Sequence, residues 1–332
     1  MKIAAGRKAG AAGLFTLLAL VACTEPEPEP APPPAVEATA PEPRPEQQTL
    51  AALRRERAAA ARQAAAAEAS PESVNMRTYL EGVEEQLVAR GRLREDSAAS
   101  DATVTAASLA RDFVQIALYD EYGSGGRGPV AAGLRRWAEP VRIQLAFGPS
   151  VDAATRARDR DLTARLAARL AEASGHPVSL VGSGGNFHVL VLSEDERADI
   201  ATRVAPLLPD LPAADLARLR DLAPQNFCTV FAYSRGGAKT YAAAVAVVRA
   251  ELPPRLRRSC FHEELAQGMG LANDSPTARP SIFNDDEEFA LLTRHDELLL
   301  RMLYDPRLRP GMREAEARPL AEAIAAELIP GS

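Results

Sequence analysis

Residues 263–274 read Glu-Glu-Leu-Ala-Gln-Gly-Met-Gly-Leu-Ala-Asn-Asp, and this stretch says most about the fold. With the residues before it, it predicts a helix over about 254–269 that is followed by a turn at Gly270. Five side chains fall on one stripe of that helix: Leu256, Cys260, Glu263, Gln267 and Gly270. Buried polar side chains need hydrogen-bond partners, so the stripe fits either a structural network or a binding site. Three arginines are candidate partners for Glu263: Arg257, Arg258 and Arg294.

The same helix keeps the spacing of a zinc-protease helix without its histidines. In H-E-x-x-H, two ligands one turn apart hold zinc, and the glutamate acts as general base. The longer metzincin form adds a glycine turn at the eighth position and a third ligand at the eleventh. Counted from Glu263, the ligand positions hold Glu263, Gln267 and Asn273. The base position holds Glu264, and the turn position holds Gly270.

A second segment strengthens this similarity. Ser281-Ile282-Phe283-Asn284 is similar to the Ser-x-Met turn beneath a metzincin site, with Phe283 where the methionine would be. On these residues the chain resembles the zincin superfamily, and specifically a bacterial envelope family of unknown function, over about residues 101–330. The resemblance implies an α/β (α+β) fold: a zincin-like domain with a mixed sheet of mainly four to five strands. An active-site-type helix follows the last strand, and an N-terminal helical region precedes the domain.

The expected element order agrees with that fold class. Apolar runs and alternation predict strands at 141–147, 178–181, 187–192, 227–233 and 240–248. Apolar positions at helical spacing predict helices over about 105–120, 153–173, 254–269 and 286–304, and a terminal helix that ends near residue 328. The stretch 194–222 is helical in character and interrupted by prolines.

The residues at the ligand positions determine which metal the site would suit. Zinc favours imidazole and thiolate, whereas carboxylate and amide oxygens suit calcium, magnesium or manganese. Glu263 with neutral Gln267 and Asn273 makes a poor zinc site. Asp274 would add a second charge, so weak binding of a divalent cation stays open as an alternative to no cofactor. Without a Lewis acid, the attacking water keeps its ordinary pKa, and Glu264 alone activates it poorly. Hydrolysis of a peptide bond by the usual zincin route is therefore not expected.

The first residues predict export to the bacterial cell envelope. Three basic residues precede the apolar run 9–22, which is too short to span a bilayer and is typical of a secretory signal. The run ends in Leu-Val-Ala-Cys at 20–23, which resembles a lipobox. That resemblance implies cleavage before Cys23, attachment of lipid there, and a protein anchored in the bilayer that faces the periplasm. The outer membrane is favoured where enterobacterial sorting rules apply. An ordinary signal sequence with a chance cysteine is the alternative.

Composition divides the rest of the N-terminal part. Residues 1–22 form the predicted signal, and 23–48 form a tether rich in proline and glutamate that cannot build a core. Residues 49–100 form the predicted helical region, with one exposed alanine-rich helix over 49–69 and a second helix over about 76–93. The domain at 101–330 follows. A formal charge of −6 becomes −9 without the three basic residues of the signal, which disfavours a nucleic-acid partner.

Two cysteines remain after Cys23, one on a predicted strand and one in the motif helix. In an oxidising compartment, Cys228 and Cys260 are expected to form a disulfide. Two reduced core thiols are the alternative. A nucleophilic Cys260 assisted by His262 is disfavoured, because residues two apart on a helix face different ways.

Two functional classes follow from these observations. The first is a non-catalytic envelope protein whose cleft binds a peptide or another envelope protein, with an edge strand beside the motif helix available for strand addition. The second is a hydrolase with Glu264 as base and oxygen ligands from Glu263, Gln267 and Asn273 or Asp274. A glycosidase-type pair made of Glu263 and Glu264 is not expected, because adjacent helical residues diverge by about 100°.

Overall fold

A computed structural model describes residues 69–97, 99, 101–120, 129–208, 211–284 and 286–331. These residues all belong to one compact unit, Ala51–Ser332. The predicted signal, Cys23, the tether and residues 49–68 of the predicted first helix lie outside them. Within the described ranges, no helix combines the length and the apolar character needed to cross a bilayer.

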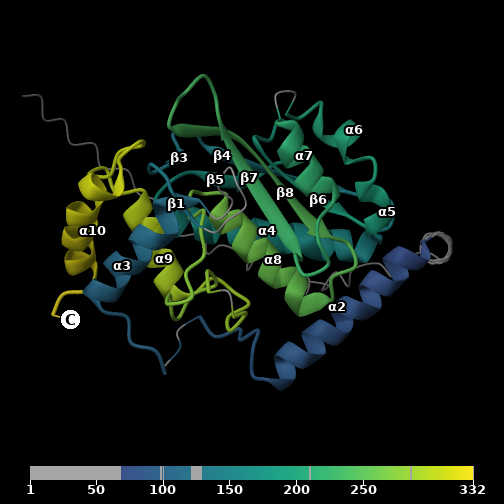
Figure 1. The fold of residues 1–332 in the computed structure, drawn as a ribbon, viewed down its shortest axis with the longest axis horizontal. Coiled ribbons are helices and arrows are strands. Elements are labelled where there is room, and N and C mark those ends of the chain that lie inside the picture. Colours follow the sequence, from purple (N-terminus) through teal and green to yellow (C-terminus); the bar gives the residue numbers. More distant parts are fainter. Residues whose placement is uncertain are drawn as a thin grey trace, which may run out of the picture. The chain divides into compact units, whose positions relative to one another are not determined.

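The core is built on a mixed sheet whose middle strands are parallel (Figure 1). In spatial order its parallel strands are β5 (Val178–Leu180), β4 (Val141–Phe147), β6 (Phe187–Leu192) and β8 (Thr240–Arg249). Two strands join β8: β7 (Cys228–Ser234) is antiparallel to it, and the short β3 (Arg136–Trp137) is parallel. The predicted α/β (α+β) class is therefore confirmed. The described part of this sheet has six strands rather than four to five, because β3 adds two residues of pairing.

The sequence explains why the central strands lie where they do. Every residue of β6 is buried, as expected for a strand that pairs with parallel neighbours and is covered on both faces. Leu190 and Leu192 point to one face, where they pack with Ile200 and Leu219. Phe187, Val189 and Val191 belong to the larger core on the other face. All five predicted strands are present, each within a residue or two of its predicted bounds.

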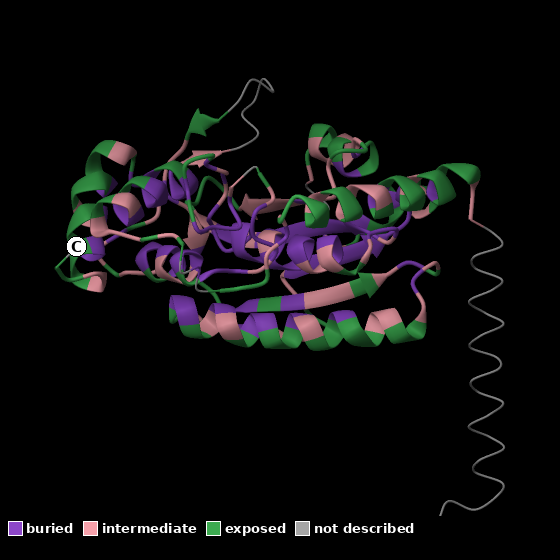
Figure 2. Ribbon diagram, turned by 90° about the horizontal axis from the view of Figure 1, so that it is seen from below, coloured by how far each residue is buried: buried purple, intermediate pink, exposed green. Residues whose placement is uncertain are grey.

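Helices cover both faces of the sheet (Figure 2). The long helices are α2 (Pro71–Ala89), α3 (Ala106–Ala117), α4 (Ala153–Ser174), α8 (Pro254–Gln267), α9 (Arg294–Leu303) and α10 (Glu314–Leu328). The proline-interrupted stretch forms three short helices: α5 (Glu194–Arg197), α6 (Ile200–Val204) and α7 (Ala213–Arg220). A separate two-stranded sheet pairs β1 (Tyr119–Asp120) with β2 (Val130–Ala131). Figure 1 shows α3, α9 and α10 gathered at one end of the main sheet.

Two helix boundaries differ from the prediction. Helix α9 starts at residue 294 rather than near 286, because Thr293 and Asp296 form a capping box that begins the helix there. Helix α2 covers 71–89 rather than 76–93, since Ser70 caps its start and Pro71 occupies the first turn.

Helix α2 contacts the rest of the fold at both of its ends. The Ser73 hydroxyl donates to Glu251 over 2.7 Å, and the Glu84 carboxylate accepts from the backbone N–H groups of Arg255 and Leu256 at the start of α8. Leu80, in the middle of α2, is fully buried. Glu84 thus satisfies two N–H groups of α8, which has no side-chain cap of its own.

Candidate functional site

The predicted motif helix is α8, and it enters directly from the loop after β8. It ends at Gln267, and the chain then turns at Gly270, which has a φ of 125°. A Cβ atom at Gly270 would lie 2.3 Å from the Arg135 carbonyl oxygen, so both conformation and space require glycine. The predicted turn at this position is confirmed.

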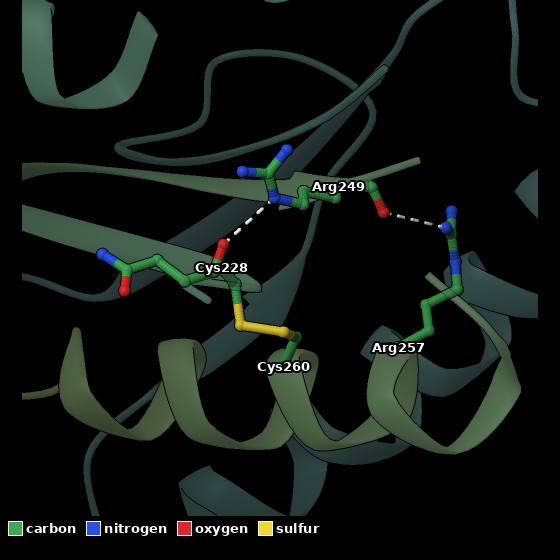
Figure 3. The surroundings of a disulfide bond; sticks show 5 residues. Cys228, Arg249, Arg257 and Cys260 are labelled. Atoms are coloured by element: carbon green, nitrogen blue, oxygen red, sulfur yellow. Dashed lines mark hydrogen bonds between the residues drawn. A yellow bond between two sulfur atoms is a disulfide. The ribbon is translucent and has the colours of Figure 1, made fainter. Parts of the chain in front are cut away.

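A disulfide joins α8 to the edge strand β7. Cys228 and Cys260 are bonded, with 5.8 Å between their Cα atoms, as the sequence predicted. Figure 3 shows the bond between strand and helix, with Arg249 and Arg257 nearby. The Arg249 side chain is fully buried and donates to the Asn226 carbonyl over 3.0 Å. The Arg249 hydrogen bond thereby holds the segment before β7 against β8, and the disulfide holds β7 against α8.

The arginines expected near Glu263 pair with other carboxylates. The three pairs are Arg257 with Asp159 on α4, Arg258 with Glu95, and Arg294 with Glu297. Each of these arginines is thus engaged by another carboxylate, and their pairing with Glu263 stays a prediction. Helical geometry explains the result, because Arg257 lies at the start of α8, on the face that packs against α4.

The first ligand position and the base position lie beside the disulfide. One carboxylate oxygen of Glu263, one of Glu264 and the Cys228 sulfur all lie within 4.8 Å of one another. The expectation that the two carboxylates diverge is thus wrong. Both glutamates stand one turn beyond Cys260, at i+3 and i+4, which are the neighbouring positions on a helix surface. That spacing was present in the sequence and could have predicted the cluster.

The other proposed ligands are held by a hydrogen-bond network at the C-terminal end of α8. The Gln267 amide donates to the Asp274 carboxylate over 3.2 Å. The Asn273 amide donates to the carbonyls of Gln115 and Asp274 over 2.9 and 2.7 Å, and the Asn273 N–H donates to the Ile116 carbonyl. Asn273 therefore fastens the loop onto the end of α3. Two amides with one carboxylate do not provide the imidazole or thiolate donors that zinc prefers, so these positions do not fit a zinc ion.

Residues 281–284 form the predicted turn, and a buried aspartate holds it. The Ser281 hydroxyl donates to Asp296 over 2.6 Å, and the backbone N–H of Phe283 donates to the Ser281 oxygen over 3.0 Å. Phe283 is fully buried. Burial raises the pKa of Asp296 to about 6, although hydrogen bonds from Ser281 and Thr293 favour its ionised form.

The raised pKa of Asp296 predicts a pH dependence of stability. The folded chain holds the proton more tightly than the unfolded chain, so this contribution is fully present below about pH 4 and is lost as the pH rises to 6. Relative to Asp296→Asn, the wild-type free energy of unfolding should fall by up to about 1.4 kcal/mol per pH unit in that window. Urea denaturation of both proteins from pH 4 to 7 measures the difference. Parallel curves would contradict the prediction.

A pocket of about 240 Å³ lies between β7 and the C-terminal end of α8. Its lining comes from β7, β8, α7, the end of α8 with the loop after it, and the segments around β1 and β3: Asp120, Arg135, Asp215, Arg218, Val230, Phe231, Ala232, Tyr233, Tyr241, Gln267, Gly268 and Ala272. Of the predicted site residues, Gln267 alone is in this lining. No pattern in the sequence indicated the other lining residues, because they come from segments far apart along the chain.

Charged pairs lie at the wall of this pocket. Arg135 forms an ion pair with Asp120, and Arg218 lies 3.7 Å from Asp215. The Tyr233 hydroxyl donates to Asp215 over 3.2 Å, and burial next to that carboxylate raises the pKa of Tyr233. These groups supply both signs of charge together with tyrosine side chains, which suits a polar chain such as a peptide.

The strand that lines the pocket is an edge strand. Among the described residues, β7 pairs with β8 alone. The Phe227 carbonyl accepts from the Arg249 N–H, so in the alternating antiparallel ladder the backbone groups of Val230 and Ala232 point away from β8. Both residues line the pocket.

Two buried histidines outside the pocket, His262 and His295, interact with neighbouring groups of the fold. The His262 Nδ1 accepts from the Leu292 N–H over 3.0 Å, and burial lowers its pKa to about 3. His295 lies 3.4 Å from Asp112, both fully buried, and desolvation lowers the pKa of His295 and raises that of Asp112. Neither histidine stands as a base beside Cys260, whose sulfur is in the disulfide.

A family model described as "Protein of unknown function (DUF2927)" matches residues 106–323, which is more than half of the 332-residue chain. The match begins at the first residue of α3 and ends within α10, so it includes the sheet, the disulfide and the pocket. No curated protein and no solved structure matched the chain. By the extent of the family match, the chain belongs to the DUF2927 family of unknown function.

Proposed function

We propose that this chain is a lipid-anchored protein of the bacterial cell envelope whose degenerate zincin-like domain binds an extended peptide segment without cleaving it. The open edge of β7 beside the pocket carries this proposal. The segment would come from a peptide or from another envelope protein. The proposed lipid anchor at Cys23 rests on the sequence at residues 20–23 alone, and the outer membrane is the favoured location.

The arrangement of β7, β8 and α8 supports the zincin-like part of the proposal. Strand β7 lies antiparallel beside β8 at the edge of the sheet. Helix α8 follows β8, the last strand of the chain, which is the order that the resemblance implies. The glycine turn at 270 and the turn at 281–284 also support this part of the proposal.

The open edge of β7 offers hydrogen bonds for strand addition. At Val230 and Ala232, N–H and C=O groups alternate toward the pocket, and an added strand would pair with them through its main chain. The charged pairs around Asp120 and Asp215 would then contact its side chains. A ligand bound mainly through its backbone needs no catalytic group.

The alternative, a hydrolase that uses a divalent cation and oxygen ligands, is less well supported. It requires Glu263, Gln267 and Asn273 or Asp274 on one ion, with Glu264 as base. The Asn273 Nδ2 group holds the loop on α3 and, among the described residues, leaves the buried Asn273 Oδ1 without a hydrogen-bond partner. Asp274, however, is outside the group formed by Glu263, Glu264 and Cys228, so the acidic side chains that this site requires are not gathered around one ion. The described residues therefore favour binding over hydrolysis.

A proline substitution at one outward-facing position of β7 tests strand addition. Selection from a library of extended peptides on the oxidised full chain should yield binders. Ala232→Pro removes an outward N–H while leaving the pairing with β8 in place, so affinity should fall at least tenfold, or about 1.4 kcal/mol. Ala232→Gly is the matched control, because it keeps the N–H, and it should bind as the wild type does. A library without binders, or equal affinity of the proline variant, would refute the proposal.

A further inference from the structure

Two carboxylates from α8 lie close to the disulfide that joins α8 to β7. Cys260, Glu263 and Glu264 share one face of α8, and Cys228 faces them from β7. One oxygen of each glutamate lies within 4.8 Å of the Cys228 sulfur, to which Cys260 is bonded. Figure 3 shows the sulfur–sulfur bond in the space between the strand and the helix. While that bond exists, neither sulfur can act as a thiolate ligand.

We propose that reduction of Cys228–Cys260 creates a binding site for a thiophilic divalent cation, with Zn²⁺ as the best fit. Its ligands are the thiolates of Cys228 and Cys260 and the carboxylates of Glu263 and Glu264. A dithiol reductant supplies two electrons and two protons: the sulfur–sulfur bond breaks, two thiols form, and the reductant becomes a disulfide. The cation then replaces the two thiol protons, which pass to solvent.

The distances suit a tetrahedral ion. Zinc binds sulfur at about 2.3 Å and carboxylate oxygen at about 2.0–2.2 Å, so neighbouring ligand atoms of a tetrahedral site are about 3.3–3.8 Å apart. The oxygen and sulfur atoms, which lie within 4.8 Å of one another, need to approach by at most about 1.5 Å, and the two sulfurs are free to separate once their bond is broken. Rotation about side-chain bonds supplies such shifts while the backbone stays in place.

The charge and the ligand types also fit zinc. Two thiolates and two carboxylates carry the same total charge as the four thiolates of a structural zinc site. Thiolates select zinc over calcium and magnesium, which prefer oxygen ligands. Cys228 and Glu263 are half-buried, which gives the ion a route from solvent, while Cys260 and Glu264 are buried.

This site differs from the one that the motif spacing suggested. It uses Glu263 but neither Gln267 nor Asn273, and Glu264 becomes a ligand rather than a base. It also does not depend on peptide binding, because the pocket at the C-terminal end of α8 includes neither cysteine. The proposal therefore stands or falls independently of the proposed function.

Metal binding in the two redox states tests the proposal. Every sample is the full chain with Cys23→Ser, so that only two cysteines remain. One half of each sample is kept oxidised. The other half is reduced with dithiothreitol, which is then removed under anaerobic conditions. Elemental analysis after zinc loading should find about one zinc per reduced chain and almost none per oxidised chain. Loading the reduced chain with Co²⁺ should give a sulfur-to-cobalt charge-transfer band that Cys228→Ser abolishes.

Carboxylate variants separate the proposed site from simple thiol binding. Glu263→Gln and Glu264→Gln should each weaken zinc binding by the reduced chain about tenfold or more. Glu322→Gln, the same change at an exposed position of α10, should leave it unchanged. Three results would overturn the proposal. The first is a reduced chain that binds no metal, whether or not that chain stays folded. The others are equal metal binding by the oxidised chain, and zinc binding by both glutamate variants that matches the wild type.

Discussion

Replacing Cys228 by serine is expected to lower the free energy of unfolding by about 3 to 4 kcal/mol, because the disulfide closes a loop of about 33 residues in the unfolded chain. The sequence separation of the two cysteines is 32 residues. The bond joins β7 to α8, so its loss should loosen the edge strand and the wall of the pocket together. Denaturation by urea without reductant measures the difference between variant and wild type.

Wild-type protein in dithiothreitol and EDTA provides the control for the serine substitution. Its stability should fall to that of the variant, and the variant itself should not respond to the reductant. If the reduced wild type kept its full stability, the bond would contribute nothing to folding. Since ordinary domains are stable by roughly 5–15 kcal/mol, the reduced chain is expected to remain folded.

Replacing Asp159 by alanine is expected to destabilise the fold by about 3 to 5 kcal/mol, because it leaves the buried Arg257 charge without its counter-ion. Arg257 donates to Asp159 over 2.6 Å, and the side chains are only 8% and 4% exposed. The pair joins the start of α8 to α4 and so fixes the helix that carries the cluster. Thermal and urea denaturation measure the loss.

Two further variants show whether the charge itself is responsible. Asp161→Ala, an exposed aspartate two residues away on α4, should change stability by less than about 0.5 kcal/mol. The double variant Asp159→Leu, Arg257→Met removes both charges and should recover most of the lost stability. A double variant as unstable as Asp159→Ala would show that packing, and not the unpaired charge, causes the effect.

Local patterns predicted most of the fold. Alternation in β4 and the continuous apolar run in β6 placed those strands, and the stripe around Cys260 placed α8. The start of α9 was missed although Thr293 and Asp296 form a recognisable capping box. The short β3 could not be predicted, since two residues carry no periodicity and pair with β8 only in the folded chain.

The candidate site could be predicted only in part. The disulfide and the turn at Gly270 followed from residue type and spacing. The grouping of Glu263 and Glu264 around Cys228 was readable from their distance to Cys260, but only after the pairing of the cysteines was known. The ion pair of Arg135 with Asp120 depends on tertiary packing, which sequence spacing does not contain.

The metal content of the oxidised full chain tests the central claim most directly, namely that α8 retains the frame of a metal-binding helix without its metal. The chain is purified with the disulfide intact, treated with EDTA, and loaded in turn with zinc, manganese and calcium, beside Glu263→Ala. We predict far less than one ion per chain for each metal, with no difference between the two proteins. About one ion per oxidised chain that Glu263→Ala loses would contradict the account and favour a metal-dependent hydrolase.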